Sequence, residues 1–251
     1  MIKIINSGCN GHMGQVVTSV VKADPDVQIV AGFDIDTLQT TDYPVYAKPS
    51  DANETADVII DFSNPATLDA LLSYGKAKKI PLVLCTTGYS TEQLEAINQA
   101  AEIIPIFRSS NMSIGINLLV DLIERACNVL GEDFDIEIVE RHHRRKIDAP
   151  SGTAILLADA ANSAISYDAD YTYERESVRK PRGSNEIGIS SIRGGTIVGV
   201  HDVIFAGHDE VVELSHTAAS RDIFALGALR AAKFLIGKTA ALYGMKELLK
   251  V

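Results

Sequence analysis

Two spacings of apolar residues alternate along the chain from Met1 to about Arg108. Short apolar runs predict buried strands, and the stretches between them carry apolar residues at helical spacing. The predicted strands are Ile2–Asn6, Val27–Phe33, Val58–Asp61, Pro81–Leu84 and Ile103–Phe107, and the predicted helices are Met13–Ala23, Pro65–Lys78 and Thr91–Ala101. This alternation is typical of βα units, so we expect a doubly wound α/β arrangement on a parallel sheet, with ligands beyond the carboxyl ends of the strands.

The pattern changes after Gly115. A long amphipathic helix is predicted up to Leu130, followed by a half-buried strand over 134–138, where apolar and acidic residues alternate. Three further strands are predicted at Ile187–Arg193, Thr196–Phe205 and Glu210–His216, and the glycine-containing turns between them favour an antiparallel meander. The polar segment Tyr167–Glu186 is expected to be a mobile loop.

These patterns predict two domains. Residues 1–112 form a predicted Rossmann-type domain, which the helical segment within 218–251 is expected to rejoin. Residues 113–217 form a predicted α+β domain with a mixed or antiparallel sheet.

The chain has 251 residues, a formal net charge of −10 and 46% hydrophobic residues. A negative chain gains little from a phosphate backbone or an anionic membrane surface, so we expect no nucleic-acid partner and no membrane association. No run approaches about 18 consecutive apolar residues, and Ile2 begins a strand-like run rather than a signal peptide. Cys9, Cys85 and Cys127 are far apart and lack a CxxC arrangement, which fits a reducing compartment. We therefore expect a cytoplasmic protein without disulfides.

A GxxGxxG motif follows the first predicted strand at the start of a helix. Close backbone approach and a helix N-terminus favour a pyrophosphate there, although a glycine-rich turn alone explains the spacing. The loop residues predicted to bind the cofactor are Gly8, Cys9, Asn10, Gly11, His12, Met13 and Gly14. Asp34 ends the second strand, where a carboxylate accepts hydrogen bonds from an adenosine ribose and repels a 2′-phosphate. The predicted cofactors are NADH and NADPH, with NADH favoured.

Two more loops follow predicted strands and are expected to border the nicotinamide. They are Cys85, Thr86, Thr87 and Gly88, and Ser109, Ser110, Asn111 and Met112. Small hydroxyl residues and glycine let backbone groups reach the carboxamide while one face of the ring stays open. The alternative is ordinary turn and helix-capping chemistry.

Six consecutive basic or imidazole residues, Arg141 to Lys146, precede a predicted helix start at Ser151-Gly152-Thr153. This positive charge is local in a negative chain, so an anionic partner is expected. Ser151 is a predicted N-cap, and Gly152 permits close approach of an anion to the helix start. Imidazole and amine groups are suitable proton donors near neutral pH. The segment therefore predicts a catalytic site for a small dicarboxylate, and the alternative is a solvated loop.

Adjacent His142 and His143 point to opposite faces of a continuing strand, so both serve one site only if the strand ends there. This geometry argues against a paired metal ligand, and no metal is expected. His201, His208 and His216 lie in the predicted meander, where surface or core roles are expected.

The segments GCNGHMG, CTTG, SSNMSIGIN and ERHHRRKIDAPSGTA resemble those of the 4-hydroxy-tetrahydrodipicolinate reductase family, also called dihydrodipicolinate reductase, of lysine and diaminopimelate biosynthesis. The segment RGGTIVGVHDVIFAG, residues 193–207, is similar to a later sheet motif of that family. The resemblance covers nearly the whole chain. It implies an oxidoreductase that reduces a cyclic unsaturated dicarboxylate, with loss of water, to tetrahydrodipicolinate.

The resemblance also implies roles for individual residues. His142 corresponds to the catalytic proton donor or acceptor and Lys146 to a proton donor, whereas His143 contacts the substrate. Gly152 and Thr153 are implied to hold a substrate carboxylate through their amides, in agreement with the helix-start argument. The family is implied to form a homotetramer through the sheet of the second domain, whose further role is substrate binding.

Three positions depart from the family pattern. His12 stands where the family usually has Arg, and no Arg follows Asp34, so strong NADPH preference is not expected. Cys85 stands where the family usually has Gly and adds a side chain beside the expected nicotinamide. An exposed thiol of low pKa there would make activity sensitive to oxidation.

Two other interpretations stay open. The same nucleotide domain and basic site suit another small oxo-acid or imine as substrate. A redox sensor that binds NAD(H) and signals through domain closure also fits, but such a sensor would not require a cluster of proton donors.

Overall fold

The computed structural model describes residues 1–38 and 41–250, which divide into two compact units. Unit 1 comprises Met1–Ser113 and Arg221–Val251, and unit 2 comprises Ile114–Ser220. The chain leaves unit 1 once and returns to it with its C-terminal segment. Residues 39, 40 and 251, which belong to the predicted Rossmann-type domain, lie outside the described residues.

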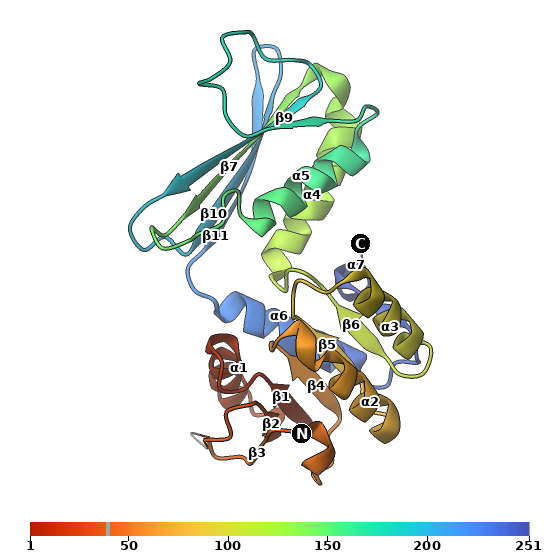
Figure 1. The fold of residues 1–251 in the computed structure, drawn as a ribbon. Coiled ribbons are helices and arrows are strands. Elements are labelled where there is room, and N and C mark those ends of the chain that lie inside the picture. The colour runs from red at the N-terminus through yellow and green to blue at the C-terminus, as the bar shows by residue number, and fades with distance from the viewer. Residues whose placement is uncertain (39–40, 251) are drawn as a thin grey trace. The chain divides into compact units, whose positions relative to one another are not determined.

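A seven-stranded sheet forms the centre of unit 1, in the order β12-β6-β5-β4-β1-β2-β3 (Figure 1). Its strands are β1 Ile2–Ser7, β2 Val27–Phe33, β3 Val45–Tyr46, β4 Val58–Asp61, β5 Leu82–Leu84, β6 Ile106–Arg108 and β12 Leu242–Tyr243. All neighbouring strands pair in parallel, which confirms the predicted doubly wound, Rossmann-type sheet. The direction of winding reverses between β1 and β4, the point where ligands bind in such sheets.

The helices of unit 1 are α1 His12–Lys22, α2 Leu68–Lys78, α3 Thr91–Ala101, α6 Asp222–Leu235 and the short α7 Met245–Leu249. Ser90 and Gln93 form the predicted capping box at the start of α3. Helix α6 packs against α1 and against strands β4, β5 and β6. A Cβ on Gly227 of α6 would stand 1.7 Å from the Met112 carbonyl oxygen, so only glycine allows this close fit.

Unit 2 contains a five-stranded mixed sheet in the order β11-β10-β7-β9-β8. Its strands are β7 Asp135–His142, β8 Asp170–Thr172, β9 Glu186–Arg193, β10 Gly199–Ala206 and β11 Val211–Ala218. The helices α4 Ile114–Leu130 and α5 Gly152–Ala164 pack together along the sheet (Figure 1). Their apolar side chains, including Ile123 and Leu157, form one core with Ile138, Ile187 and Val203 of the strands. The predicted α+β class with a mixed sheet is confirmed.

The expected antiparallel meander is wrong for β9. Strands β10 and β11 form an antiparallel hairpin, but β9 pairs in parallel with β7, and β7 pairs antiparallel with β10. The connection from Arg193 to Gly199 therefore crosses the end of β7, where the Gly194 amide donates to the His142 carbonyl oxygen at 2.9 Å. Apolar periodicity predicts that a segment is a strand, but it carries no signal for the neighbours of that strand.

The segment expected as a mobile loop, Tyr167–Glu186, is attached to the sheet. It contains β8, which pairs in parallel with β9. Arg175 forms an ion pair with Glu186 at 2.6 Å, and Arg182 forms one with Asp135 at 2.7 Å. The expectation of a loop is therefore wrong for β8 and for Glu186, which begins β9, and the mobility of the remaining residues stays a prediction.

Candidate active site

The basic segment of unit 2 lies between the end of β7 and the start of α5. Strand β7 ends at His142, as required if His142 and His143 serve one site. Ser151 is the N-cap of α5, as predicted, and its hydroxyl oxygen accepts a hydrogen bond from the Ala154 amide at 3.1 Å. A Cβ on Gly152 would have nothing within 4 Å. The backbone at this helix start is therefore open to close approach by an anion.

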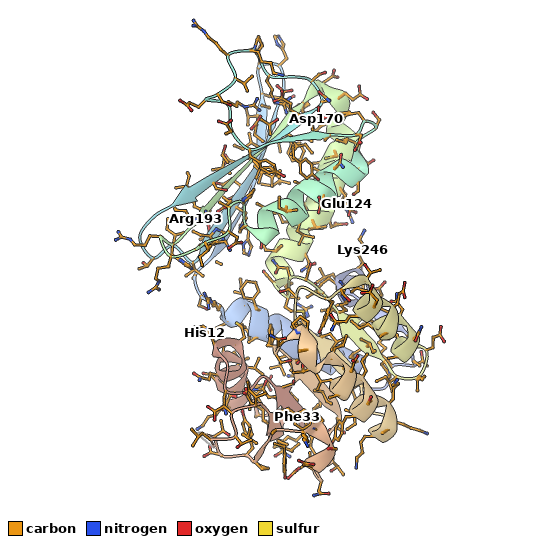
Figure 2. The ribbon with its side chains drawn as sticks, viewed as in Figure 1. His12, Phe33, Glu124, Asp170, Arg193 and Lys246 are labelled. Carbon is orange, nitrogen blue, oxygen red and sulfur yellow. The ribbon has the colours of Figure 1, made fainter. Side chains whose placement is uncertain are left out.

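One buried carboxylate connects the end of β7 with the start of α5. Glu140 is 0% exposed, and it lies 2.6 Å from Nδ1 of His142 and accepts from the Ser151 amide at 3.1 Å. Arg193, labelled in Figure 2 at the end of β9, donates to both carboxylate oxygens at 2.7 Å. It also donates to the Asp148 carbonyl oxygen at 2.6 Å. Strands β7 and β9, the basic segment and α5 are thus held by one hydrogen-bonded network.

This network keeps Glu140 ionised and orients His142. Burial alone would raise the pKa of Glu140, but the hydrogen bonds from Arg193 and His142 outweigh it and lower that pKa to about 2. An ionised carboxylate only accepts, so Nδ1 of His142 carries a proton and the lone pair of the neutral ring lies at Nε2. Burial lowers the pKa of His142, and the hydrogen bond to Glu140 opposes that shift. Nε2 is therefore the nitrogen that can exchange a proton.

His201 of β10 supports Ser151 from the other side. Its Nε2 lies 2.9 Å from Ser151 Oγ, and its ring packs edge to face with His142 at a centroid distance of 5.2 Å. Burial, then the charge of His142, lowers the pKa of His201 to about 4, so the ring is neutral near pH 7. His201 has the expected core position, but this contact also connects it to the site. His208 is exposed, whereas His216 pairs across the strands with His201.

Lys146 and His143 lie together in the turn that follows β7. Nζ of Lys146 is 2.8 Å from the Asp148 carboxylate, and its amide donates to the His143 carbonyl oxygen at 3.0 Å. Nδ1 of His143 is buried and lacks a hydrogen-bond partner within residues 1–38 and 41–250. Both residues are half-buried, so the contact of His143 with a substrate stays a prediction.

The other basic side chains have different surroundings. Arg141 alternates with His142 along β7 and forms an ion pair with the buried Asp202 of β10. Arg144 and Arg145 are exposed. The six basic residues therefore do not form one positively charged patch, because the charge of Arg141 is paired within the sheet.

In unit 1, the glycine-rich loop joins β1 to α1. Gly8 has a φ of +77°, and a Cβ there would stand 2.5 Å from the Phe62 carbonyl oxygen. A Cβ on Gly14 would come within 2.0 Å of the Gly8 carbonyl oxygen. Gly11 is the N-cap of α1 and provides no side-chain cap, which suits an anion at the first-turn amides. His12 begins α1 and is labelled in Figure 2. This loop fits a dinucleotide pyrophosphate.

Asp34 lies against the same loop, as the ribose argument requires. Its two carboxylate oxygens accept from the Asn10 amide at 2.9 Å and from the Asp36 amide at 3.1 Å. The Asn10 side chain donates to the Asp36 carbonyl oxygen at 2.6 Å. Each carboxylate oxygen keeps a further lone pair that suits a ribose hydroxyl. The structure thus brings Asp34 and the glycine-rich loop together.

Cys85 contradicts the expectation of an exposed thiol with a low pKa. Its side chain is buried, and burial, followed by the charge of Asp61, raises its pKa well above the usual range. Cys9 is also buried, and a Cβ on Gly32 would come within 2.5 Å of its sulfur. The side chain of Cys9 therefore belongs to the core, and only its backbone can make the predicted cofactor contact.

The two loops expected beside the nicotinamide expose only some of their residues. Thr87, Gly88 and Ser110 are exposed. The buried members are Cys85, Thr86, Asn111 and Met112. The hydroxyl of Ser109 donates to the Asn111 carbonyl oxygen at 2.7 Å, which closes the second loop. Their contact with a cofactor stays a prediction.

Sequence reasoning missed Glu140, Arg193 and His201. A signal existed for Glu140, because it continues the alternation of Ile136 and Ile138 on the buried face of β7. A carboxylate at a position where an apolar residue is expected indicates a paired, buried charge. Arg193 carried no local signal, because 53 residues separate it from Glu140.

Comparison with known proteins decides the family. A family model described as the N-terminus of dihydrodipicolinate reductase matches residues 2–112, and one for its C-terminus matches residues 115–249. The chain belongs to the dihydrodipicolinate reductase family. The 4-hydroxy-tetrahydrodipicolinate reductase of Caldanaerobacter subterraneus is 51% identical over 250 residues, which cover 100% of this chain and 99% of the relative. That of Clostridium perfringens is 47% identical over 253 residues, with coverage of 100% and 99%.

A solved member of the dihydrodipicolinate reductase family has the same fold. The dipicolinate-bound enzyme from Paenisporosarcina sp. TG-14 superposes with a TM-score of 0.83 at 23% identity, covering 98% of this chain and 99% of that chain. The resemblance inferred from the motifs is thus confirmed, and family membership makes this chain an oxidoreductase of lysine and diaminopimelate biosynthesis. Within the described ranges, no helix is long and apolar enough to cross a membrane, and no group of three or more His, Cys, Asp or Glu side chains is arranged to hold a metal ion.

Proposed function

We propose that this member of the dihydrodipicolinate reductase family reduces 4-hydroxy-tetrahydrodipicolinate to tetrahydrodipicolinate, with NADH or NADPH as the electron donor. The observation that carries the proposal is the Glu140 network, which holds an oriented histidine beside an uncovered helix start. The first group suits proton transfer and the second suits a carboxylate. The fully conjugated analogue dipicolinate is present in the related structure from Paenisporosarcina.

Substrate binding is assigned to the start of α5 and to the turn before it. Backbone amides of Gly152 and Thr153 would hold one carboxylate, with Ser151 keeping the first turn of the helix in place. His143, a half-buried residue of the same turn, would contact the substrate through the accessible part of its ring. The ammonium group of Lys146 adds positive charge close by, since its ion pair with the exposed Asp148 can exchange for a substrate carboxylate.

The chemistry requires one hydride and one proton, and it releases the C4 hydroxyl as water. A dinucleotide held by the glycine-rich loop would provide this hydride for C4 of the ring. His142 is the proposed proton donor or acceptor at Nε2, because Glu140 keeps the other nitrogen protonated. Lys146 is the second proposed proton donor. Glu140 does not exchange the proton itself, since its pKa of about 2 keeps it ionised.

The cofactor contacts are assigned to the loop Gly8–Gly14, to Asp34 and to the loops after β5 and β6. We propose a preference for NADH. Asp34 is held by the amides of Asn10 and Asp36, so its charge faces a fixed direction beside the glycine-rich loop. A 2′-phosphate next to this carboxylate would experience repulsion between like charges.

We also propose a cytoplasmic homotetramer assembled through the sheet of unit 2. Helices α4 and α5 cover one face of that sheet. Apolar side chains that remain accessible on its strands support an interface, since Ile192 is 48% exposed and Val211 is 63% exposed.

The test is the oxidation of NADH and of NADPH by the purified protein, with substrate made in situ by condensing pyruvate with aspartate semialdehyde. We expect substrate-dependent oxidation that is faster with NADH at equal, subsaturating concentrations. Faster oxidation of NADPH would contradict the role of Asp34 in cofactor choice. Binding of a dinucleotide without oxidation would contradict the proposed reaction and favour another oxo-acid substrate or a sensor.

A further inference from the structure

Unit 1 contains a buried carboxylate that the proposed chemistry does not use. Asp61 is 1% exposed and forms the last residue of β4. Three hydroxyl groups donate to it: Ser7 at 2.7 Å and Ser63 at 2.5 Å to one oxygen, and Thr86 at 2.7 Å to the other. The fold thus supplies the hydrogen-bond donors that a buried carboxylate requires, since an unsatisfied carboxylate would strongly destabilise the protein.

The three donors lie in or next to three different loops, and two of these loops, Gly8–Gly14 and Cys85–Gly88, belong to the predicted cofactor site. Ser7 immediately precedes Gly8 of the glycine-rich loop, Ser63 follows β4, and Thr86 belongs to the loop after β5. In the sheet, Asp61 is paired with Ser7 of β1 on one side and with Leu84 of β5 on the other. The bond from Ser7 to Asp61 therefore spans the place between β1 and β4 where the winding direction reverses.

The loops are also in direct contact at this point. The Ser63 amide donates to the Thr86 hydroxyl oxygen at 3.0 Å, so that oxygen both accepts from Ser63 and donates to Asp61. A Cβ on Gly8 would overlap the Phe62 carbonyl oxygen at 2.5 Å. A displacement of any one loop would break bonds in the other two.

We infer that Asp61 is a positioning residue for dinucleotide binding, which fixes the loops after β1, β4 and β5 in one arrangement through their hydroxyl groups. The inference rests on the proposed function, since it presumes that the loops after β1 and β5 bind NADH or NADPH. The inferred role requires a carboxylate at this position. An asparagine has the same shape, but its NH₂ group is a donor and would face either the Thr86 hydroxyl or the hydroxyls of Ser7 and Ser63.

The test compares Asp61→Asn with the wild-type protein by titration with NADH and NADPH. We expect dinucleotide affinity to fall about tenfold or more, because buried hydroxyls lose their acceptor and the loops lose their common anchor. At saturating dinucleotide, the KM for the dicarboxylate substrate should be unchanged. Wild-type affinity in a folded Asp61→Asn variant would overturn the inference.

A matched control separates positioning from general destabilisation. Asp24→Asn also neutralises a carboxylate of unit 1, where it removes the 2.6 Å ion pair that joins Asp24 to Lys233 of α6. We expect this variant to retain dinucleotide affinity. An equal loss of affinity in Asp24→Asn would show that any weakening of unit 1 has the same effect, and would overturn the specific role of Asp61.

Two milder variants keep the inference testable if Asp61→Asn does not fold. Ser7→Ala and Thr86→Val each remove one donor to Asp61, and each is expected to weaken dinucleotide binding by a smaller factor. Unchanged affinity in both would overturn the inference.

The titration of the wild-type protein separates the inference about Asp61 from the proposed function. A wild-type protein that binds neither dinucleotide would contradict the proposed function itself.

Discussion

Glu140 in unit 2 and Asp61 in unit 1 occupy similar positions in their sheets, but Glu140 has charged hydrogen-bond partners and Asp61 has neutral ones. Each lies at or near the carboxyl end of a strand in the middle of its sheet, and each is buried. Glu140 is paired with the guanidinium of Arg193 and with an imidazole, and its pKa is lowered to about 2 despite its burial. Asp61 is surrounded by neutral hydroxyls, and burial raises its pKa even though those hydrogen bonds oppose the shift.

The difference shows that burial alone does not assign a role to a carboxylate. A carboxylate paired with a cation stays ionised and can orient a neighbouring imidazole for proton transfer. A carboxylate satisfied by hydroxyls carries no compensating charge, but it can collect donors from several loops at one point. The first arrangement suits the chemical step, and the second suits the shape of a binding site.

The largest effect is expected when the group oriented by Glu140 is removed. His142→Gln should lower kcat by about 10²–10⁴-fold, the usual contribution of a general acid or base. Dinucleotide affinity should stay unchanged, because the loops that Asp61 connects are intact. Steady-state kinetics and NADH titration provide the measurements. The exposed His208→Gln serves as the control, and wild-type turnover in His142→Gln would remove His142 from the proposed mechanism.

Removal of Glu140 itself should reduce turnover less than removal of His142. For Glu140→Gln we expect a fall in kcat of about 10–100-fold, because a neutral amide with one acceptor oxygen replaces the charged acceptor that fixes the tautomer of His142. Glu186→Gln is a matched control, since Glu186 is also buried and accepts from Arg175 at 2.6 Å and from the Gly183 amide at 2.9 Å. If both variants lost turnover equally, the effect would come from the sheet rather than from His142.

Lys146 is bonded to neither Glu140 nor Asp61, and its replacement tests whether the turn after β7 contributes positive charge to substrate binding and catalysis. Lys146→Ala should lower kcat and raise the substrate KM, with a combined loss in kcat/KM of about 10-fold or more, because a charged hydrogen-bond donor is removed. Arg145→Ala removes the same charge from an exposed neighbour and should have a smaller effect. Kinetics like those of the wild type in Lys146→Ala would contradict its proposed role.

The two carboxylates should also give opposite dependences of stability on pH. The folded-state pKa of Glu140 is about 2 against an ordinary 4.5, so its ionised form stabilises the fold above pH 4.5 and this contribution is lost as the pH falls towards 2. The pKa of Asp61 is raised above 3.8, so its contribution is fully present below 3.8 and lost as the pH rises through the folded-state pKa.

Urea unfolding of the wild type and of the two amide variants, at a series of pH values, measures this difference. As the pH falls from neutral, the stability of the wild type relative to Glu140→Gln should decrease, and that relative to Asp61→Asn should increase. Slopes of the same sign would show that the two carboxylates do not differ in the way described.

The smallest effect is expected at Cys85, whose pKa is raised by burial and by the charge of Asp61. A buried thiol reacts slowly with peroxide, because the thiolate is the reactive form. Mild peroxide should therefore leave activity unchanged, as followed by NADH oxidation and by the mass of the intact protein. A loss of activity that Cys85→Ser prevents would contradict this expectation.

Local signals predicted the regular elements well. Strands β2 and β4 and helix α3 begin and end at the predicted residues, because apolar runs and the Ser90 capping box are encoded in adjacent positions. The edge strands β3, β8 and β12 were missed. They have two or three residues each, which is too short for an apolar periodicity to be recognised. They are strands because they pair with a neighbouring strand.

Within the candidate site, local signals located the helix start and the end of β7, but not the groups that orient them. The N-cap Ser151 was predicted because capping residues have a characteristic position before an apolar run. Arg193 and His201 reach Glu140 and Ser151 only after long-range strand pairing. Cys85 was misjudged because solvent exposure depends on the packing of the whole unit, which a loop motif does not record.

The connection of the two units has a consequence for the order in which the protein can be completed during synthesis. Helix α6, residues 222–235, packs on β4, β5 and β6, strands that are translated more than 100 residues earlier. Unit 2 is continuous from Ile114 to Ser220, so all of its strands emerge from the ribosome before α6 does. The sheet that carries the glycine-rich loop is therefore the first to be started and the last to be closed.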